Sequence, residues 1–435
     1  MRRSLIVLLC ATLAATACAA DDGVDVDEAV AIGVDGDRVP GSATGSLEWG
    51  PCPDENLVVA TECAVLQVPL DHDDPEGRQL EIAVARATTA DTDRRIGSLV
   101  FNPGGPGGSG IEFLQAAAAI TPPAVAERFD LVGFDPRGVG ASTAVSCDVA
   151  IDDNVTLVPD GDDEAYAELV AQTEEDLEAC TDDSVEIGPH LGTNNAARDL
   201  DLLRDALGDE GLSYVGYSYG TRLGATYAEL FPDRVRALVL DAAVKPTTDP
   251  EELDLGQADG FDRALTNFAT ACDADTDCAL VEVGSTLEVL ERLRARLDDV
   301  GTLPTSDPDR VLTRGELDLG VIAALYSKDS WPFLAEGLAS ADVGGDGTLL
   351  QVLGDGLQGR RPDGTYDNSN VANWFINCAD DPERPGVDEV RAAAERAADR
   401  SQYFDDALRA STGCLSMPVS AEPLLVGPAE NAPPI

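Results

Sequence analysis

Short apolar runs alternate with amphipathic stretches through the first half of the chain. Runs rich in Val, Leu and Phe predict buried strands, and they occupy residues 97–101, 129–134, 212–215 and 235–241. Two further runs, 65–70 and 80–86, flank a turn at 73–77 and predict an antiparallel pair.

Helical patterns lie between these strands. Ala196, Leu200, Leu203 and Leu207 share one face of a helix that Asn194 or Asn195 can cap and Gly208 can end. Strands that alternate with helices predict an α/β fold, with a mostly parallel sheet and helices on both faces.

The pattern changes after about Lys245, where helices follow one another without strands. One helix is marked by Leu287, Leu290, Leu293 and Leu297, another by residues 317–326 and a third by 390–400. These helices predict a cap over residues 246–420, inserted after the strand that ends near Asp241 in a core at 46–245.

An apolar strand pattern returns at 423–427, within a last segment of 421–435. One more helix and strand need about seventeen residues at average lengths, and 435 minus 427 leaves 8. We therefore expect the C-terminal end of the sheet to be incomplete.

The N-terminus has the pattern of an export signal. Residues 1–18 run from Arg2-Arg3 through an apolar stretch to small residues that end at Cys18, a lipobox-like site for lipidation. The alternative is plain cleavage after Ala17 or Ala20, which would discard Cys18. Residues 19–45 are acidic with little that could pack, which predicts a disordered tether. We expect an exported chain whose contact with a membrane is through a lipid anchor.

Composition narrows the function classes. The formal net charge is -52, from 81 acidic and 29 basic residues, which disfavours nucleic-acid binding. Apart from Cys10 and Cys18 there are eight cysteines, an even set typical of disulfides in an exported protein. The short loops favour Cys52 with Cys63 and Cys272 with Cys278, and we pair the remainder as Cys147 with Cys180 and Cys378 with Cys414. No Cys-x-x-Cys pattern occurs, so we expect no metal and no cofactor.

The pentapeptide 216–220, Gly-Tyr-Ser-Tyr-Gly, stands between an apolar run and a helical run. This is the pattern of a nucleophile elbow, in which Gly216 and Gly220 allow a turn tight enough to expose Ser218. Two backbone amides must face the oxyanion that forms when a serine attacks a carbonyl. Tyr219, after the serine, would supply one. Gly105, in the glycine-rich loop 102–110, would supply the other; the same loop lacks the Lys-Ser/Thr of a phosphate-binding turn.

A serine needs a base, and the chain has two histidines, His72 and His190, both ahead of Ser218. The order of the catalytic residues in an α/β-hydrolase is serine, acid, histidine, so neither fits. Asp241 could act as an acid or be an ordinary residue at a strand end. Asp135 and Arg137 are expected to stabilise their own turn. Asp380 and Asp381 could receive a substrate ammonium group or lie in a solvated loop.

Six segments in order resemble secreted bacterial α/β-hydrolases of the tripeptidyl aminopeptidase and proline iminopeptidase type. They are residues 49–52, 68–71, 102–107, 134–138, 197–201 and 216–221. The resemblance implies an α/β-hydrolase fold and removal of short peptides or a residue from a peptide with a free N-terminus.

Where that family carries an acid and a histidine, this chain has residues 428–435, with Asn431 roughly where the acid would fall. We therefore expect weak or no activity, whether because the reading frame is altered or cut short or because the cleft is kept for binding alone. An esterase and a non-catalytic peptide-binding surface protein are the alternatives.

Overall fold

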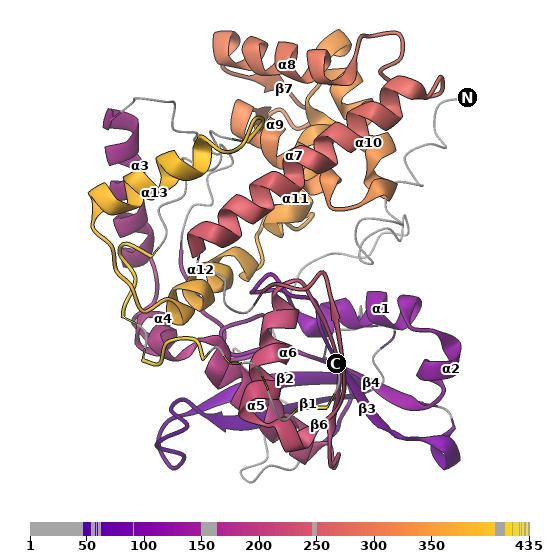
Figure 1. Ribbon diagram of the computed structural model, residues 1–435, viewed down its shortest axis with the longest axis vertical. Coiled ribbons are helices and arrows are strands. Elements are labelled where there is room, and N and C mark those ends of the chain that lie inside the picture. The colour runs from indigo at the N-terminus through magenta and orange to yellow at the C-terminus, as the bar shows by residue number, and fades with distance from the viewer. Residues whose placement is uncertain are drawn as a thin grey trace.

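The computed structural model describes residues 47–53, 57, 59, 62–89, 91–148, 163–245, 250–404, 414–419, 421–425, 427, 429 and 432–433. The expected signal, the tether and Cys18 lie outside these residues. Figure 1 shows a sheet with flanking helices in one half of the molecule and a group of helices above it.

One six-stranded sheet forms the centre of the first half, in the order β1-β2-β4-β3-β5-β6. Its strands are β1 (Glu62–Pro69), β2 (Gln79–Ala87), β3 (Gly97–Asn102), β4 (Phe129–Phe134), β5 (Leu212–Tyr217) and β6 (Val235–Asp241). β2 is antiparallel to both β1 and β4, and the remaining pairs are parallel. The sheet is therefore mostly parallel with an antiparallel start, as the sequence predicts.

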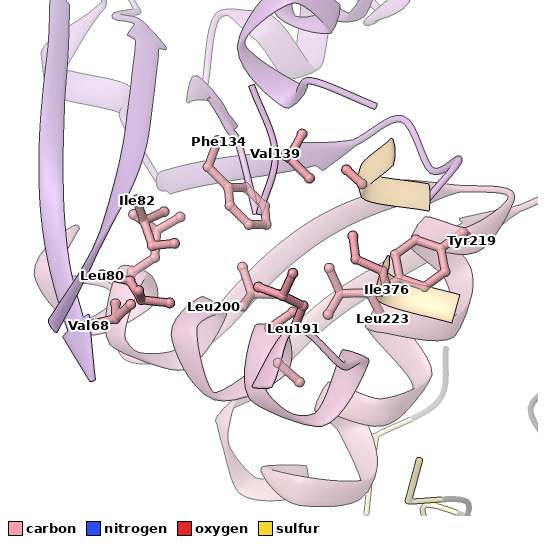
Figure 2. Close-up of a cluster of buried hydrophobic side chains, with 14 of the residues drawn as sticks. Val68, Leu80, Ile82, Phe134, Val139, Leu191, Leu200, Tyr219, Leu223 and Ile376 are labelled. Atoms are coloured by element: carbon pink, nitrogen blue, oxygen red, sulfur yellow. The ribbon is translucent and has the colours of Figure 1, made fainter. Parts of the chain in front are cut away.

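Alternation along the strands sends side chains to two apolar layers. Val100 and Val132 pack into one cluster, whereas the neighbouring Phe101 and Leu131 pack into another. The second cluster is covered by α1 (Gly110–Ile120), which lies near α2 (Pro123–Ala126). The first is covered by α5 (Thr193–Ala206) and α6 (Tyr219–Leu230), as Figure 2 shows for Leu200 and Leu223.

The start of α5 differs from the expectation that Asn194 or Asn195 caps it. The N-cap is Gly192, which makes no side-chain capping bond. The amide of Thr193 instead donates to the carboxylate of Asp380, 2.6 Å away on another helix. Asn194 is then free to bind Pro423 O and the amide of Leu425. The carboxylate of Asp380, from a distant segment, thus accepts from an amide in the first turn of α5, as a local capping residue would. The local sequence pattern does not reveal this contact.

The helical group has its own apolar cluster, built around Leu265, Leu293, Leu317 and Leu350. It comprises α7 (Pro250–Ala274), α8 (Thr286–Val300), α9 (Arg314–Leu325), α10 (Trp331–Ala339) and α11 (Thr348–Gln358), with a hairpin of β7 (Leu303–Pro304) and β8 (Val311–Leu312). The sequence pattern predicted α8 and α9. It did not single out α7, α10 or α11, in which glycines and small residues interrupt the apolar spacing.

The remaining helices lie outside this cluster. They are α3 (Asp163–Glu178), α4 (Asp182–Ile187), α12 (Ser369–Asp380) and α13 (Val387–Ala398), of which the sequence predicted α13. α3 and α4 precede α5 and were not expected. α12 falls within the range expected for the cap, yet Ala372, Phe375 and Ile376 belong to the apolar cluster of the sheet.

The strand expected at 423–427 is not formed in the part of it that the structure describes. Leu424 N donates to Asp380 O, 3.2 Å away, and Leu425 N donates to the Asn194 side chain at 2.9 Å. These bonds hold the segment against α5 and α12, so its amides are used away from the sheet. β6 stands at the end of the strand order, with most of its residues exposed or half-buried.

Four disulfides join the eight described cysteines: Cys52–Cys63, Cys147–Cys180, Cys272–Cys278 and Cys378–Cys414. They are the four pairs that the sequence analysis chose, and their number is typical of an exported protein. Across the part of the chain that the structure describes, no helix combines the length and hydropathy needed to cross a membrane.

Candidate active site

Ser218 occupies the turn between β5 and α6. Its backbone has φ 52° and ψ -123°, a region that residues other than glycine adopt only under strain. The residue is exposed, although its neighbours Tyr219 and Gly220 are buried. The turn therefore presents the serine side chain to solvent at the end of β5, an interior strand of the sheet, as a nucleophile elbow does.

The two glycines of the pentapeptide are required by close packing. A Cβ atom on Gly220 would lie 2.8 Å from the carbonyl oxygen of Asn102, on the neighbouring strand. A Cβ atom on Gly216 would meet the carbonyl oxygen of Gly220. Larger residues at either position would push α6 away from the sheet and open the turn.

The glycine-rich loop lies directly against this turn. A Cβ atom on Gly104 would lie 3.0 Å from the amide nitrogen of Tyr219 and 3.0 Å from Cβ of Ser218. The loop is held by bonds from Gly104 N to Asn102 Oδ1 at 3.0 Å and from Gly108 N to Gly104 O at 3.1 Å. Within the described residues, the amides of Gly105 and Tyr219 donate to no protein acceptor. Two unused amides thus belong to segments that meet beside Ser218.

The end of β6 supports the turn through its backbone. Ser218 N donates to the carbonyl oxygen of Asp241 at 3.0 Å. Thr221 Oγ1 donates to the carbonyl oxygen of Ser218 at 2.6 Å and accepts from Val244 N at 2.8 Å. Asp241 thus contacts the serine by its main chain, and its exposed side chain makes no hydrogen bond to Ser218.

Neither histidine is bonded to Ser218. His72 Nε2 lies 3.0 Å from Asp199 Oδ1, within a cluster that includes Arg137. His190 follows α4, and burial lowers the pKa of its imidazole. The structure thus keeps both side chains out of hydrogen-bonding contact with the serine.

Asp135 and Arg137 support the loop after β4. Asp135 is buried, which raises its pKa, and it accepts from Ser109 Oγ at 2.6 Å and from Ala141 N at 2.8 Å. Arg137 is fully buried and donates to both oxygens of Asp199 at 2.6 Å. Both side chains have structural partners, in line with the expectation that they stabilise local structure.

Asp380 does not lie in the solvated loop that was one of the two expectations. It is the last residue of α12, it is 7% exposed, and burial raises its pKa to about 6. Its carboxylate accepts from Thr193 N and from Thr193 Oγ1, both at 2.6 Å. Asp381 accepts from Glu383 N at 2.8 Å and so supports its own turn. Asp380 is therefore not in a solvated loop, and its oxygens are already bonded.

Two contacts of the site were missed by sequence reasoning. The hydroxyl of Tyr219 lies 2.6 Å from Thr193 Oγ1, which joins the residue after the serine to Asp380. Asn373 Nδ2 donates to the carbonyl oxygen of Pro106, in the glycine-rich loop, at 3.0 Å. Tyr219 and Thr193 are 26 residues apart in the chain, Thr193 and Asp380 are 187 apart, and Pro106 and Asn373 are 267 apart, so no local pattern marks these contacts.

A strand-turn-helix serine beside a glycine-rich loop, on a mostly parallel sheet with helices on both faces, defines a hydrolase of the α/β-hydrolase class. The sequence model of the α/β-hydrolase fold matches residues 97–374, which include both the loop and the serine turn. The chain belongs to this family of hydrolytic enzymes.

Three relatives that are similar in sequence are named as hydrolases. The serine protease Hip1 of Mycobacterium tuberculosis is 40% identical over 373 residues, which cover 82% of this chain and 71% of the relative. Carboxylesterase B of the same species is 38% identical over 77% of this chain and 66% of its own length. The tripeptidyl aminopeptidase of Streptomyces lividans is 33% identical over 78% of this chain and 64% of its own length. Two of the three names support a hydrolase of the peptidase type.

Solved structures overlap with the chain less closely. The proline iminopeptidase of Mycobacterium smegmatis aligns with 53% of this chain and 60% of its own length, at 17% identity and a TM-score of 0.28. An overlap of this size carries no argument by itself.

Proposed function

We propose that the chain is a serine aminopeptidase that removes short peptides or single residues from peptides with a free N-terminus, through an acyl-enzyme on Ser218. One observation carries the proposal: an exposed serine, strained in the turn between β5 and α6, packs against the glycine-rich loop at Gly104. Among the described residues, the amides of Gly105 and Tyr219 in these two segments donate to no protein acceptor. The names of two relatives support the peptidase class.

In this proposal the oxygen of Ser218 attacks the peptide carbonyl carbon, and the carbonyl oxygen takes up the negative charge. The amides of Gly105 and Tyr219 donate to that oxygen. Removing one such donor costs about 10²–10³ in kcat in a well-studied serine peptidase. The peptide C–N bond then breaks, and the amine leaves with the proton that the Ser218 hydroxyl gave up. Water then hydrolyses the acyl ester, which releases the carboxylic acid and returns a proton to Ser218.

Within the described residues, neither histidine is bonded to Ser218 to act as the base for this step. The two histidines have other surroundings, His72 beside Asp199 and His190 after α4. Loss of the base from a serine triad costs on the order of 10⁶ in kcat, about 8 kcal/mol of barrier. We therefore propose that acylation by these 435 residues is slow, and the acid and base stay unassigned.

An esterase on the same scaffold is the second candidate, because one relative is named carboxylesterase B. Esters carry a better leaving group than amides and depend less on protonation of that group. A peptide-binding surface protein is the non-enzymatic candidate. It is favoured because neither histidine is bonded to Ser218 as a base. For all three we propose export through the signal at residues 1–18, with Cys18 as the lipidated residue; the four disulfides support export.

The test compares tripeptidyl anilides that carry a free or an acetylated N-terminus with simple aryl esters. Added imidazole supplies the base, since Ser218 is exposed and open to a small molecule. The aminopeptidase proposal predicts imidazole-dependent cleavage of the free tripeptide substrate, slower cleavage of the acetylated one, and neither reaction with Ser218→Ala. Cleavage of esters alone would favour the esterase, and peptide binding without any cleavage would favour the surface protein.

A further inference from the structure

Helix α12 is fixed to the sheet rather than to the helical group above it. Phe375 is fully buried and Ile376 is 2% exposed, both in the cluster that covers one face of the sheet. Ile376 lies beside Tyr219 and Leu223 in Figure 2. A helix packed in this way holds its polar side chains at fixed positions relative to the serine turn.

The first half of α12 contacts the glycine-rich loop. Asn373 Nδ2 donates to the carbonyl oxygen of Pro106 at 3.0 Å, and Asn373 Oδ1 accepts from Asn377 Nδ2 at 2.9 Å. The second bond fixes which end of the Asn373 amide faces the loop. A Cβ atom on Gly107 would lie 3.0 Å from the amide nitrogen of Asn373, so the loop and the helix touch through their backbones as well.

The last residue of α12 contacts the serine turn through one intermediary. The Asp380 carboxylate accepts from Thr193 Oγ1 at 2.6 Å, which leaves this hydroxyl to accept from the hydroxyl of Tyr219 at 2.6 Å. All three side chains are nearly inaccessible, at 7%, 0% and 6% exposure for Asp380, Thr193 and Tyr219. Hydrogen bonds with a charged acceptor in such surroundings are short and strong.

We propose that α12 sets the geometry of the oxyanion hole, with Asn373 positioning the loop of Gly105 through Pro106 and Asp380 positioning Tyr219 through Thr193. The inference rests on the proposed roles of Gly105 and Tyr219. Both asparagine and aspartate act through other residues, so they are positioning residues rather than catalytic ones. A single helix thereby couples two segments that lie more than 100 residues apart in the chain.

The first test measures hydrogen exchange in the full chain and needs no catalysis. Protected amides report on both segments: Gly104 and Gly108 in the loop, and Ser218 and Thr221 in the turn. Thr193→Val and Tyr219→Phe should each raise exchange of peptide 216–222 about tenfold and leave peptide 103–108 unchanged, because local opening follows the loss of local bonds. Asn373→Ala should raise exchange of peptide 103–108 about tenfold and leave peptide 216–222 unchanged.

Matched controls separate positioning from general stability. Thr193→Ser keeps the hydroxyl and should match the parent chain. Asn370→Ala removes an exposed amide of the same helix, bonded to Gln358 O and not to the loop, and should also match it. The inference is overturned if Thr193→Val and Asn373→Ala leave the exchange rates of both segments unchanged. It is also overturned if exchange rises uniformly, including in residues 317–325.

The second test uses the imidazole-supported cleavage of the free tripeptide substrate. Thr193→Val and Asn373→Ala should lower kcat about tenfold with KM unchanged, because an interaction made only in the transition state is weakened. A change in KM alone contradicts the positioning role. Absence of cleavage in the parent chain would sink the proposed function, whereas the exchange experiment would still decide whether α12 holds the two segments.

Discussion

Gly104 has no room for a side chain because a Cβ atom there would meet the carbonyl oxygen of Tyr217, one residue before the exposed serine. Its φ of 95° also lies in a region that disfavours any other residue. The close approach brings the glycine-rich loop to the amide of Tyr219. The proximity of these two segments is what makes an oxyanion site possible.

Gly104→Ala should therefore displace the loop and suppress reaction of Ser218. We expect the rate of labelling by a fluorophosphonate, measured with added imidazole, to fall at least about tenfold. Displacing the donor amide from the oxyanion should cost much of the rate that removing it would cost. Gly208→Ala is the matched control. Gly208 also has a positive φ, 78°, but nothing lies within 4 Å of its Cβ position. Equal labelling of both variants would show that the loop does not contribute.

The backbone strain at Ser218 predicts that a glycine at this position gives a more stable protein than an alanine. With φ 52° and ψ -123°, the position suits glycine better than alanine. Ser218→Gly should unfold with a free energy about 1 kcal/mol higher than Ser218→Ala, in urea titrations. In the interior of α1, by contrast, Ala116→Gly should lower the free energy of unfolding by about 1 kcal/mol. A less stable Ser218→Gly would contradict the backbone strain at the turn.

Asp380 predicts a pH dependence of stability. Burial raises the pKa of its carboxyl to about 6 in the folded chain, above the usual 3.8, although Thr193 and the nearby charge of Arg222 favour the ionised form. Tyr219 is the other titratable group that faces it. The folded chain thus binds this proton more tightly than the unfolded chain. The stability that the group contributes is present below pH 3.8 and is lost as pH rises to about 6.

Comparison with Asp380→Asn isolates this effect. The free energy of unfolding of the parent chain, minus that of Asp380→Asn, should fall between pH 4 and pH 6 and then level off. Asp254 is half-buried and its pKa is also raised to about 6 by desolvation, but it is present in both proteins and cancels in the difference. A constant difference across this range would contradict the raised pKa of Asp380.

The helical group should lose stability independently of the sheet, because it has a separate apolar cluster. Asp318 is 4% exposed and binds Arg294 at 2.6 Å and Arg314 at 3.0 Å. Asp318→Asn leaves Arg294 with only the exposed Glu291, 4.0 Å away, as a charge partner. Because its buried partner is lost, the change should destabilise this group by about 3 kcal/mol. The measurement is hydrogen exchange of residues 317–325 against residues 129–134.

A more exposed ion pair of the same group serves as the control. Asp342 binds Arg292 at 2.6 Å, and the arginine side chain is 48% exposed. Asp342→Asn should therefore change stability by less than about 1 kcal/mol. Faster exchange of residues 129–134 in Asp318→Asn would show that the two clusters unfold together.

The sequence predicted the strands of the sheet well because each is short, apolar and bounded by turn residues. β4 and β6 have the predicted bounds, and Ser218 stands where the glycine pattern put it. The cap of α5, the place of Asp380 and the bond from Asn373 to Pro106 could not be found in this way. Each depends on partners that only the fold brings together, and all three involve α12, which lies within the range expected for the cap.

We propose that Ser218 reacts as a nucleophile beside the backbone amides of Gly105 and Tyr219. Mass spectrometry of the full chain, treated with a fluorophosphonate in imidazole buffer, tests it most directly. We expect one adduct, on Ser218, and no adduct in Ser218→Ala. An adduct elsewhere with Ser218 unmodified, or equal modification of the two proteins, would contradict it.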